Sequence, residues 1–149
     1  MAKRMDSQTA LSRLRTFLLA MAIFLFAGTV VELIFQEHTG ELLQLIPFIL
    51  SGLGIAALAA VLIRPRHITL VALQASMLLV VLGSAVGLFI HLSANLGFAQ
   101  EIQPNATSAQ LLTETLHGAA PILAPGMLAV AALLAFAATY QHPELSKKM

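Results

Sequence analysis

The sequence predicts an all-α protein, a bundle of four transmembrane helices with a short amphipathic helix in the outer loop between the third and fourth spans. Of its 149 residues, 58% are hydrophobic and only 10% are charged, whereas a soluble domain averages about 25% charged residues. The mean hydropathy is +0.88. The apolar residues fall into four runs, each about as long as the ~20 residues that cross a bilayer.

This composition excludes several classes of function. So few charges cannot cover a water-facing surface, which argues against a soluble enzyme, a disordered protein or a nucleic-acid binder. The chain has no cysteine, so no disulfide or thiolate ligand is possible. It has no nucleophile motif and no phosphate-binding loop, so we do not expect an enzyme. The natural partner of such a chain is the lipid bilayer.

The four runs define the expected spans, at about residues 16–36, 42–63, 68–92 and 118–140 of a single membrane domain, residues 1–149. A buried strand would be much shorter than any of them, so we expect a helix in each. Basic residues precede the first run, as they do in a signal peptide. Its apolar stretch is too long for one and no clear cleavage site follows, so we expect a retained helix.

The distribution of basic residues predicts the orientation. With the N-terminus in the cytoplasm, four spans place every basic residue on the cytoplasmic side and none outside, which satisfies the positive-inside rule throughout. These residues are Lys3, Arg4, Arg13, Arg15, Arg64, Arg66, Lys147 and Lys148. We therefore expect a multi-pass protein with both termini in the cytoplasm.

The long outer loop, residues 93–117, should contain helix at both ends. A spacing of four, three and three residues keeps four side chains near one helical face: His91, Asn95, Phe98 and Glu101. The third helix should therefore continue beyond the lipid until Pro104 ends it. Thr107 and Gln110 match a capping box that opens a second, amphipathic helix running to about His117.

The start of the fourth span is irregular. Pro121 and Pro125 each remove a backbone donor, and Gly126 loosens the chain further. We expect the regular helix to begin only near Pro125, with a kinked or re-entrant segment before it. A simple proline kink is the alternative.

A cluster of histidines and carboxylates on the outer side is the candidate functional site. Helix ends in a bundle lie within roughly 10–15 Å of one another, and imidazole with carboxylate suits zinc, copper, iron or manganese. The predicted ligands are Glu32, His38, His91, Glu101 and His117, supported by Asn95, Glu114, Pro121, Pro125 and Gly126. The alternative is that the histidines are ordinary interfacial residues bound to loop carbonyls.

Glu32 is the most informative member of this cluster. A charged side chain at the centre of a membrane helix costs about 2.5–3.5 kcal/mol, and less near the ends. We therefore expect Glu32 to face the bundle interior, protonated, hydrogen-bonded or paired with a histidine. The alternative is an interfacial residue that reaches toward water. A haem is not expected, because no two histidines lie at mid-membrane depth on different spans.

Rows of small residues predict close helix packing. They are Gly83 and Gly87 in the third span, and Gly52, Ala56 and Ala60 in the second. Such rows let helix backbones approach closely in lipid. They serve either the packing of this bundle or contacts with other membrane subunits.

Several motifs at the outer ends of the spans form a recognisable pattern. They are Glu32 with His38, Gln44-x-x-Pro47, the series from Gly87 through His91, Asn95 and Phe98 to Glu101, Gly118 with Pro121, Ala124-Pro125-Gly126, and His142-Pro143. This pattern resembles an uncharacterised family of small four-span proteins of the bacterial inner membrane. The resemblance implies that architecture and location, and implies no activity.

Three functions therefore remain open from the sequence. The first is a small membrane protein with a metal-binding cluster on its outer face. The second is a structural or accessory subunit of a larger membrane complex. The third is an oligomeric proton- or cation-coupled transporter that uses Glu32.

Overall fold

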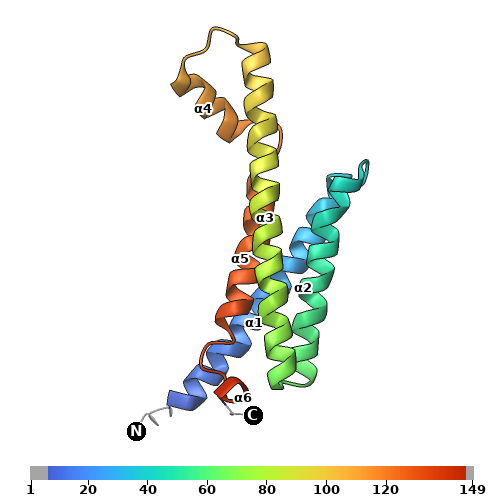
Figure 1. Ribbon diagram of the computed structural model, residues 1–149, viewed down its shortest axis with the longest axis vertical. Helices are drawn as coiled ribbons and strands as arrows, with labels where there is room; N and C mark the ends of the chain where they lie inside the picture. Colours follow the sequence, from blue (N-terminus) through green and yellow to red (C-terminus); the bar gives the residue numbers. More distant parts are fainter. Residues whose placement is uncertain (1–6, 147–149) are drawn as a thin grey trace.

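The computed structural model describes residues 7–146, which are helical with no strand in that range. The elements are α1 (Ser7–Phe35), the 3-10 helix η1 (Leu42–Leu45), α2 (Ile46–Ile63), α3 (His67–Ile102), α4 (Ser108–His117), α5 (Leu123–Ala137) and α6 (Pro143–Ser146), as Figure 1 shows. Four of the basic residues that predict the orientation lie outside the described residues: Lys3, Arg4, Lys147 and Lys148.

Within residues 7–146, three helical segments are long and apolar enough to cross a membrane: Ser7–Phe35, Leu42–Ile63 and His67–Ile102. The fourth apolar helix, α5, has only 15 residues, or about 22 Å at 1.5 Å per residue, against ~30 Å of hydrocarbon. It is shorter at both ends than the expected span over 118–140. The two prolines predict that regular helix begins near Pro125, and the structure begins α5 two residues earlier, at Leu123.

The helix α3 is the centre of the fold. It packs against α2 and α5, α1 packs against α5 and α2, and α4 folds back on the upper part of α3 (Figure 1). At the lower end, which holds the α2–α3 connection and α6, the long helices lie close together. At the upper end, the pair α1–α2 diverges from α3, so the molecule forks there.

Small residues bring the helices together below the fork. A Cβ atom built on Gly54 of α2 would lie 2.6 Å from the ring of Phe26 of α1, so this glycine is what lets the ring enter. Gly83 of α3 makes the same kind of room for Leu50 of α2, and Gly87 faces Pro125 of α5. Gly83 and Gly87 therefore serve packing within the chain. The other small-residue row is exposed on the outside of α2: Gly52, Ala56 and Ala60.

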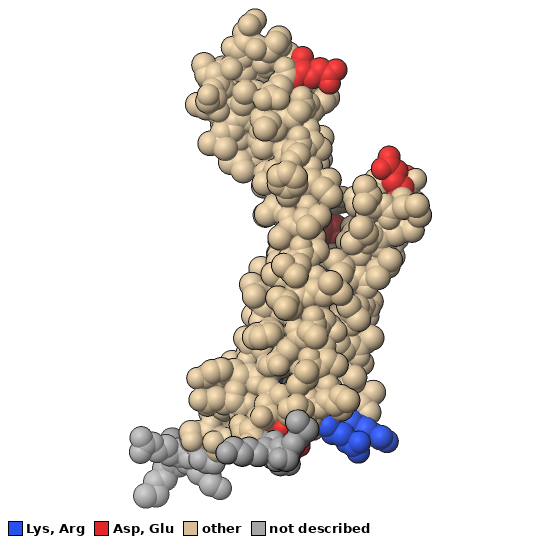
Figure 2. Space-filling view, viewed as in Figure 1, with Lys and Arg blue, Asp and Glu red and all other residues tan. Residues whose placement is uncertain are grey.

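The described charges separate to the two ends of the molecule. The arginines Arg13, Arg15, Arg64 and Arg66 belong to the lower end. The carboxylates Glu32, Glu37, Glu41, Glu101 and Glu114 belong to the upper end. Figure 2 shows acidic side chains over the tip of α3 and over the α1–α2 connection, and basic ones beside the α2–α3 connection. Glu144 of α6, at the lower end, is the exception.

A polar clamp holds the C-terminal end of α5. The last carbonyls of a helix lack partners within the helix, and a nearby cation is favourable there. Arg15 of α1 is only 8% exposed and donates hydrogen bonds of 3.2 and 3.0 Å to the carbonyl oxygen of Tyr140 and of 2.6 Å to that of Gln141. Gln74 of α3 donates to the Thr139 hydroxyl at 2.8 Å. The clamp thus joins α1 and α3 to the end of α5.

Replacing Arg15 with alanine should destabilise the protein measurably. The change removes hydrogen bonds from a charged donor, each of which contributes about 1.5–3 kcal/mol, and leaves carbonyls without that donor. We expect the melting temperature in detergent to fall by several degrees. The matched control is Arg64→Ala, in the exposed α2–α3 connection, which should melt close to wild type. Equal melting temperatures for the two variants would contradict a clamp.

Candidate functional site

The fork contains a cleft of about 380 Å³ between the α1–α2 pair and the wall formed by α3 and the start of α5. Its walls are mainly apolar. Polar side chains from the α1–α2 connection and α3 also line it: Gln36, His38, Glu41, Gln44 and His91. Ser84 and Thr29 contribute polar groups nearer the bundle core. Figure 2 shows the corresponding hollow between the α1–α2 tip and α3. A concave, apolar site with a few polar groups is the usual form of a ligand pocket.

The turn after α1 brings His38 to this cleft. Glu37 adopts a left-handed conformation, with φ of 49°, and the His38 amide donates to the Leu33 carbonyl at 3.0 Å. The Glu37 amide donates to the Ile34 carbonyl at 3.1 Å. These two bonds are those of a Schellman motif, which usually has glycine at the left-handed position. This sequence has glutamate at that position, so no glycine marks the end of α1 in the sequence.

His38 and His91 face each other across the cleft. Their ring centroids lie 6.4 Å apart, with the ring planes inclined by 42°. Burial and the repulsion of a nearby His91 charge both lower the pKa of His38 below its ordinary value. The Nδ1 atom of His91 is buried and has no hydrogen-bond partner in the described part of the chain. The His38 ring therefore favours its neutral form, and the buried Nδ1 atom of His91 is left for a ligand to satisfy.

The remaining predicted ligands do not join this pair. Glu101 lies at the exposed tip of α3, ten residues or about 15 Å of helix beyond His91. The His117 ring lies 2.9 Å from the Thr113 carbonyl, through its Nδ1 atom, and is exposed. Neither residue lines the cleft. Over residues 7–146, no three His, Cys, Asp or Glu side chains lie close enough to hold a metal ion. The predicted five-residue cluster is therefore not assembled.

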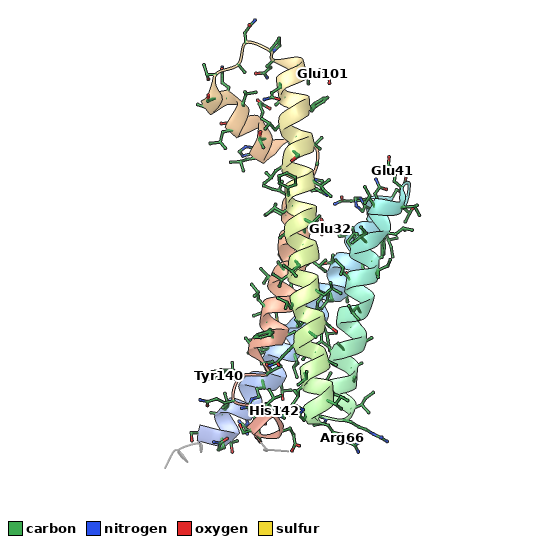
Figure 3. All side chains as sticks on the ribbon, viewed as in Figure 1. Glu32, Glu41, Arg66, Glu101, Tyr140 and His142 are labelled. Carbon is green, nitrogen blue, oxygen red and sulfur yellow. The ribbon has the colours of Figure 1, made fainter. Side chains whose placement is uncertain are left out.

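Glu32 does not face the bundle interior, and that expectation is wrong. It is exposed and accepts a hydrogen bond of 3.1 Å from Gln36, one turn later on α1. Figure 3 shows Glu32 and Glu41 on the α1–α2 side of the opening and Glu101 at the tip of α3. Glu32 lies three residues before the end of α1 at Phe35, the position that the interfacial alternative requires. Its hydrogen-bond partner Gln36 lines the cleft, so Glu32 lies at the edge of the cleft without lining it.

Asn95 fastens the segment before α5 to α3. It is 4% exposed and donates to the carbonyl oxygens of Thr115 at 3.1 Å and Ala120 at 3.0 Å. Its own carbonyl accepts from the Ala120 amide at 2.9 Å. A Cβ atom on Gly118 would overlap the Asn95 side chain, so this glycine permits the contact. Asn95 is thus a structural residue that positions one wall of the cleft.

The other supporting residues divide between the cleft and the surface. Pro121 and Pro125 line the cleft, whereas Glu114 and Gly126 do not. Ser84 also lines the cleft, although it is not among the residues predicted for the site. It is 3% exposed, and its hydroxyl has no hydrogen-bond partner within the described range. A serine in an apolar helix gives no sign from the sequence that its hydroxyl will meet a cavity.

Comparison with protein-family models, curated proteins and solved structures finds no match to this chain. The resemblance to a bacterial inner-membrane family therefore remains an expectation, and function rests on the geometry of the cleft.

The pKa of His38, measured by NMR titration of isotope-labelled histidine in chelator-treated protein, should lie below the ordinary value of about 6.5. Because the unfolded state then binds the proton more tightly, stability should fall as the pH drops from about 6.5 through the pKa of folded His38. His91→Ala should raise the pKa of His38, because it removes the one repulsive charge and leaves only the effect of burial. His117→Ala should leave it unchanged. A pKa of 6.5 or higher in wild type would contradict this environment.

Proposed function

We propose that this chain is a four-span protein of the bacterial inner membrane that binds a small, largely apolar molecule with polar groups in the cleft at its outer face. One observation carries the proposal: a cleft of about 380 Å³ with apolar walls, edged by polar side chains. This volume lies within the roughly 300–1,000 Å³ of typical ligand pockets. The proposed activity is binding, with no chemical step.

The polar atoms of the α3 wall narrow the class of ligand. Ser84 and His91 are seven residues apart, two helical turns, and therefore lie about 10 Å apart on one face of α3. The Ser84 hydroxyl and His91 Nδ1 both lack partners in the described chain, and a buried polar atom without a partner costs about 1–3 kcal/mol. An elongated molecule with one polar group near each end would satisfy both.

The interior favours binding over transport. A second cavity of about 180 Å³ lies at the lower end, beside Arg15 and His142. Fully buried apolar side chains fill the bundle between the two cavities, among them Phe26 and Met77. A transporter needs polar groups along its path, and among the described residues this layer offers the buried hydroxyl of Ser51 but no continuous polar path.

A role as an accessory subunit is the second candidate. It is favoured by the exposed row of Gly52, Ala56 and Ala60 on α2. Apart from its chain neighbours and the adjacent backbone of α2, no described atom lies within 4 Å of a Cβ built on Gly52. A helix from another subunit could approach this row closely. Such an association is compatible with binding in the cleft, which lies on the other side of α2.

The test of the proposed function is to fill the cleft. Ala124 lines it, so Ala124→Phe should displace a bound molecule. Protein purified in lipid nanodiscs would be extracted with organic solvent and the extract analysed by mass spectrometry. We expect one co-purified compound class in wild type, reduced roughly tenfold or more in Ala124→Phe. The matched control, Ala56→Phe on the exposed face of α2, should retain it. Identical extracts from all three proteins would contradict a ligand-binding cleft.

The orientation and the number of spans can be tested together, because the chain has no cysteine. Single cysteines would replace Ser12, Ser108 and Ser146, which are exposed, and spheroplasts would be treated with a membrane-impermeant thiol reagent. Ser108→Cys should react in intact spheroplasts, and the other two only after lysis. Labelling of Ser146→Cys but not Ser12→Cys in intact spheroplasts would show an odd number of spans.

A further inference from the structure

We infer that His38 and His91 together bind a divalent transition-metal ion at the mouth of the cleft. This inference goes beyond the binding of an organic molecule and does not require it. It replaces the predicted five-residue cluster with a site of two protein ligands, with the remaining coordination positions open toward the cleft.

The distance between the rings fits a shared ion. Zinc–imidazole bonds are about 2.0–2.1 Å long, so two imidazoles at the tetrahedral angle of zinc have ring centroids roughly 5 Å apart. The observed separation of His38 and His91 is 6.4 Å, and a movement of the rings by about 1 Å brings both to one ion. The rings come from separate parts of the chain, one from the turn after α1 and one from α3. A shared ion would therefore hold the two sides of the fork together.

The two rings are also available to an ion. Over the described residues, neither the His38 ring nor the His91 ring makes a hydrogen bond, and His91 Nδ1 is buried without a partner. By contrast, the His117 ring contacts the Thr113 carbonyl at 2.9 Å, and the His142 ring accepts from the Glu144 amide at 3.3 Å. Turning the His38 and His91 rings toward an ion therefore breaks no existing interaction.

The surrounding charges favour a cation over an anion. Glu41 lines the same cleft, and Glu32 is bound to Gln36 at its edge. The described arginines all belong to the opposite end of the molecule. A cleft with carboxylates at its edge and no nearby basic residue concentrates cations.

The ligand chemistry defines the class of metal. Imidazole nitrogen suits zinc, copper and nickel, whereas calcium and magnesium need several oxygen ligands. The chain offers no thiolate. Two imidazoles leave coordination positions for water or for a polar group of a molecule in the cleft, so the site is an open one.

The experiment is zinc binding to chelator-stripped protein in detergent, measured by calorimetry and by metal analysis after dialysis. Wild type should bind one zinc ion per chain. His38→Ala and His91→Ala should each weaken binding at least tenfold. The matched controls His117→Ala and Glu101→Gln remove predicted ligands that the structure places elsewhere, and they should bind as wild type does. No zinc binding in wild type, or equal losses in the controls, would overturn the inference.

Two further measurements keep the test independent of variant folding and of the organic ligand. Electron paramagnetic resonance of wild-type protein loaded with Cu²⁺ should show coupling to two imidazole nitrogens, and coupling to none would overturn the site. Ala124→Phe fills the cleft but leaves both rings in place, so it should lose the organic ligand and keep zinc binding. The experiments can therefore contradict the metal site and the binding of an organic ligand independently of each other.

Discussion

The short helix α5 needs partners at both ends, and much of the structure depends on them. Its 15 residues leave polar backbone before and after it, and backbone polar groups in lipid must be satisfied by the protein. Arg15 binds the carbonyls that follow α5, and Asn95 binds the segment that precedes it. Both ends are thus fixed by hydrogen bonds to other helices. These bonds fix the position of the wall that α5 builds with α3 at both of its ends.

The cleft follows from a change in packing along the bundle. Below the fork, two glycines admit the side chains of Phe26 and Leu50, and the helices lie in contact. Above it, α3 continues for several turns while α1 has ended, and α4 and Asn95 stabilise the extension. Leu50 lies both in the glycine contact and in the lining of the cleft. The same side chain therefore closes the core and forms part of the base of the site.

The ends and caps of the helices could be predicted from the sequence, whereas the contacts between helices could not. Pro104 indicated the end of α3, and Thr107 with Gln110 indicated the capping box of α4, because each signal acts over a few residues. The inward orientation of Glu32 was wrong, because a helix that is apolar on every side does not reveal which face meets its neighbours. Likewise, His38 pairs with His91 and not with the other predicted ligands. This pairing depends on the left-handed Glu37 and on the length of α3, which only the assembled structure shows.

The length of α5 has a consequence for the surrounding lipid. Its outward side chains are apolar from Leu123 to Phe136 and cover about 22 Å along the axis, whereas α3 is much longer. In the proposed four-span topology, lipids beside α5 must shorten or tilt to match it, at a modest cost for each ångström of hydrophobic mismatch. The protein should therefore partition toward thinner regions of a membrane. Acyl-chain length would then bear on the α3–α5 wall, which lines one side of the cleft.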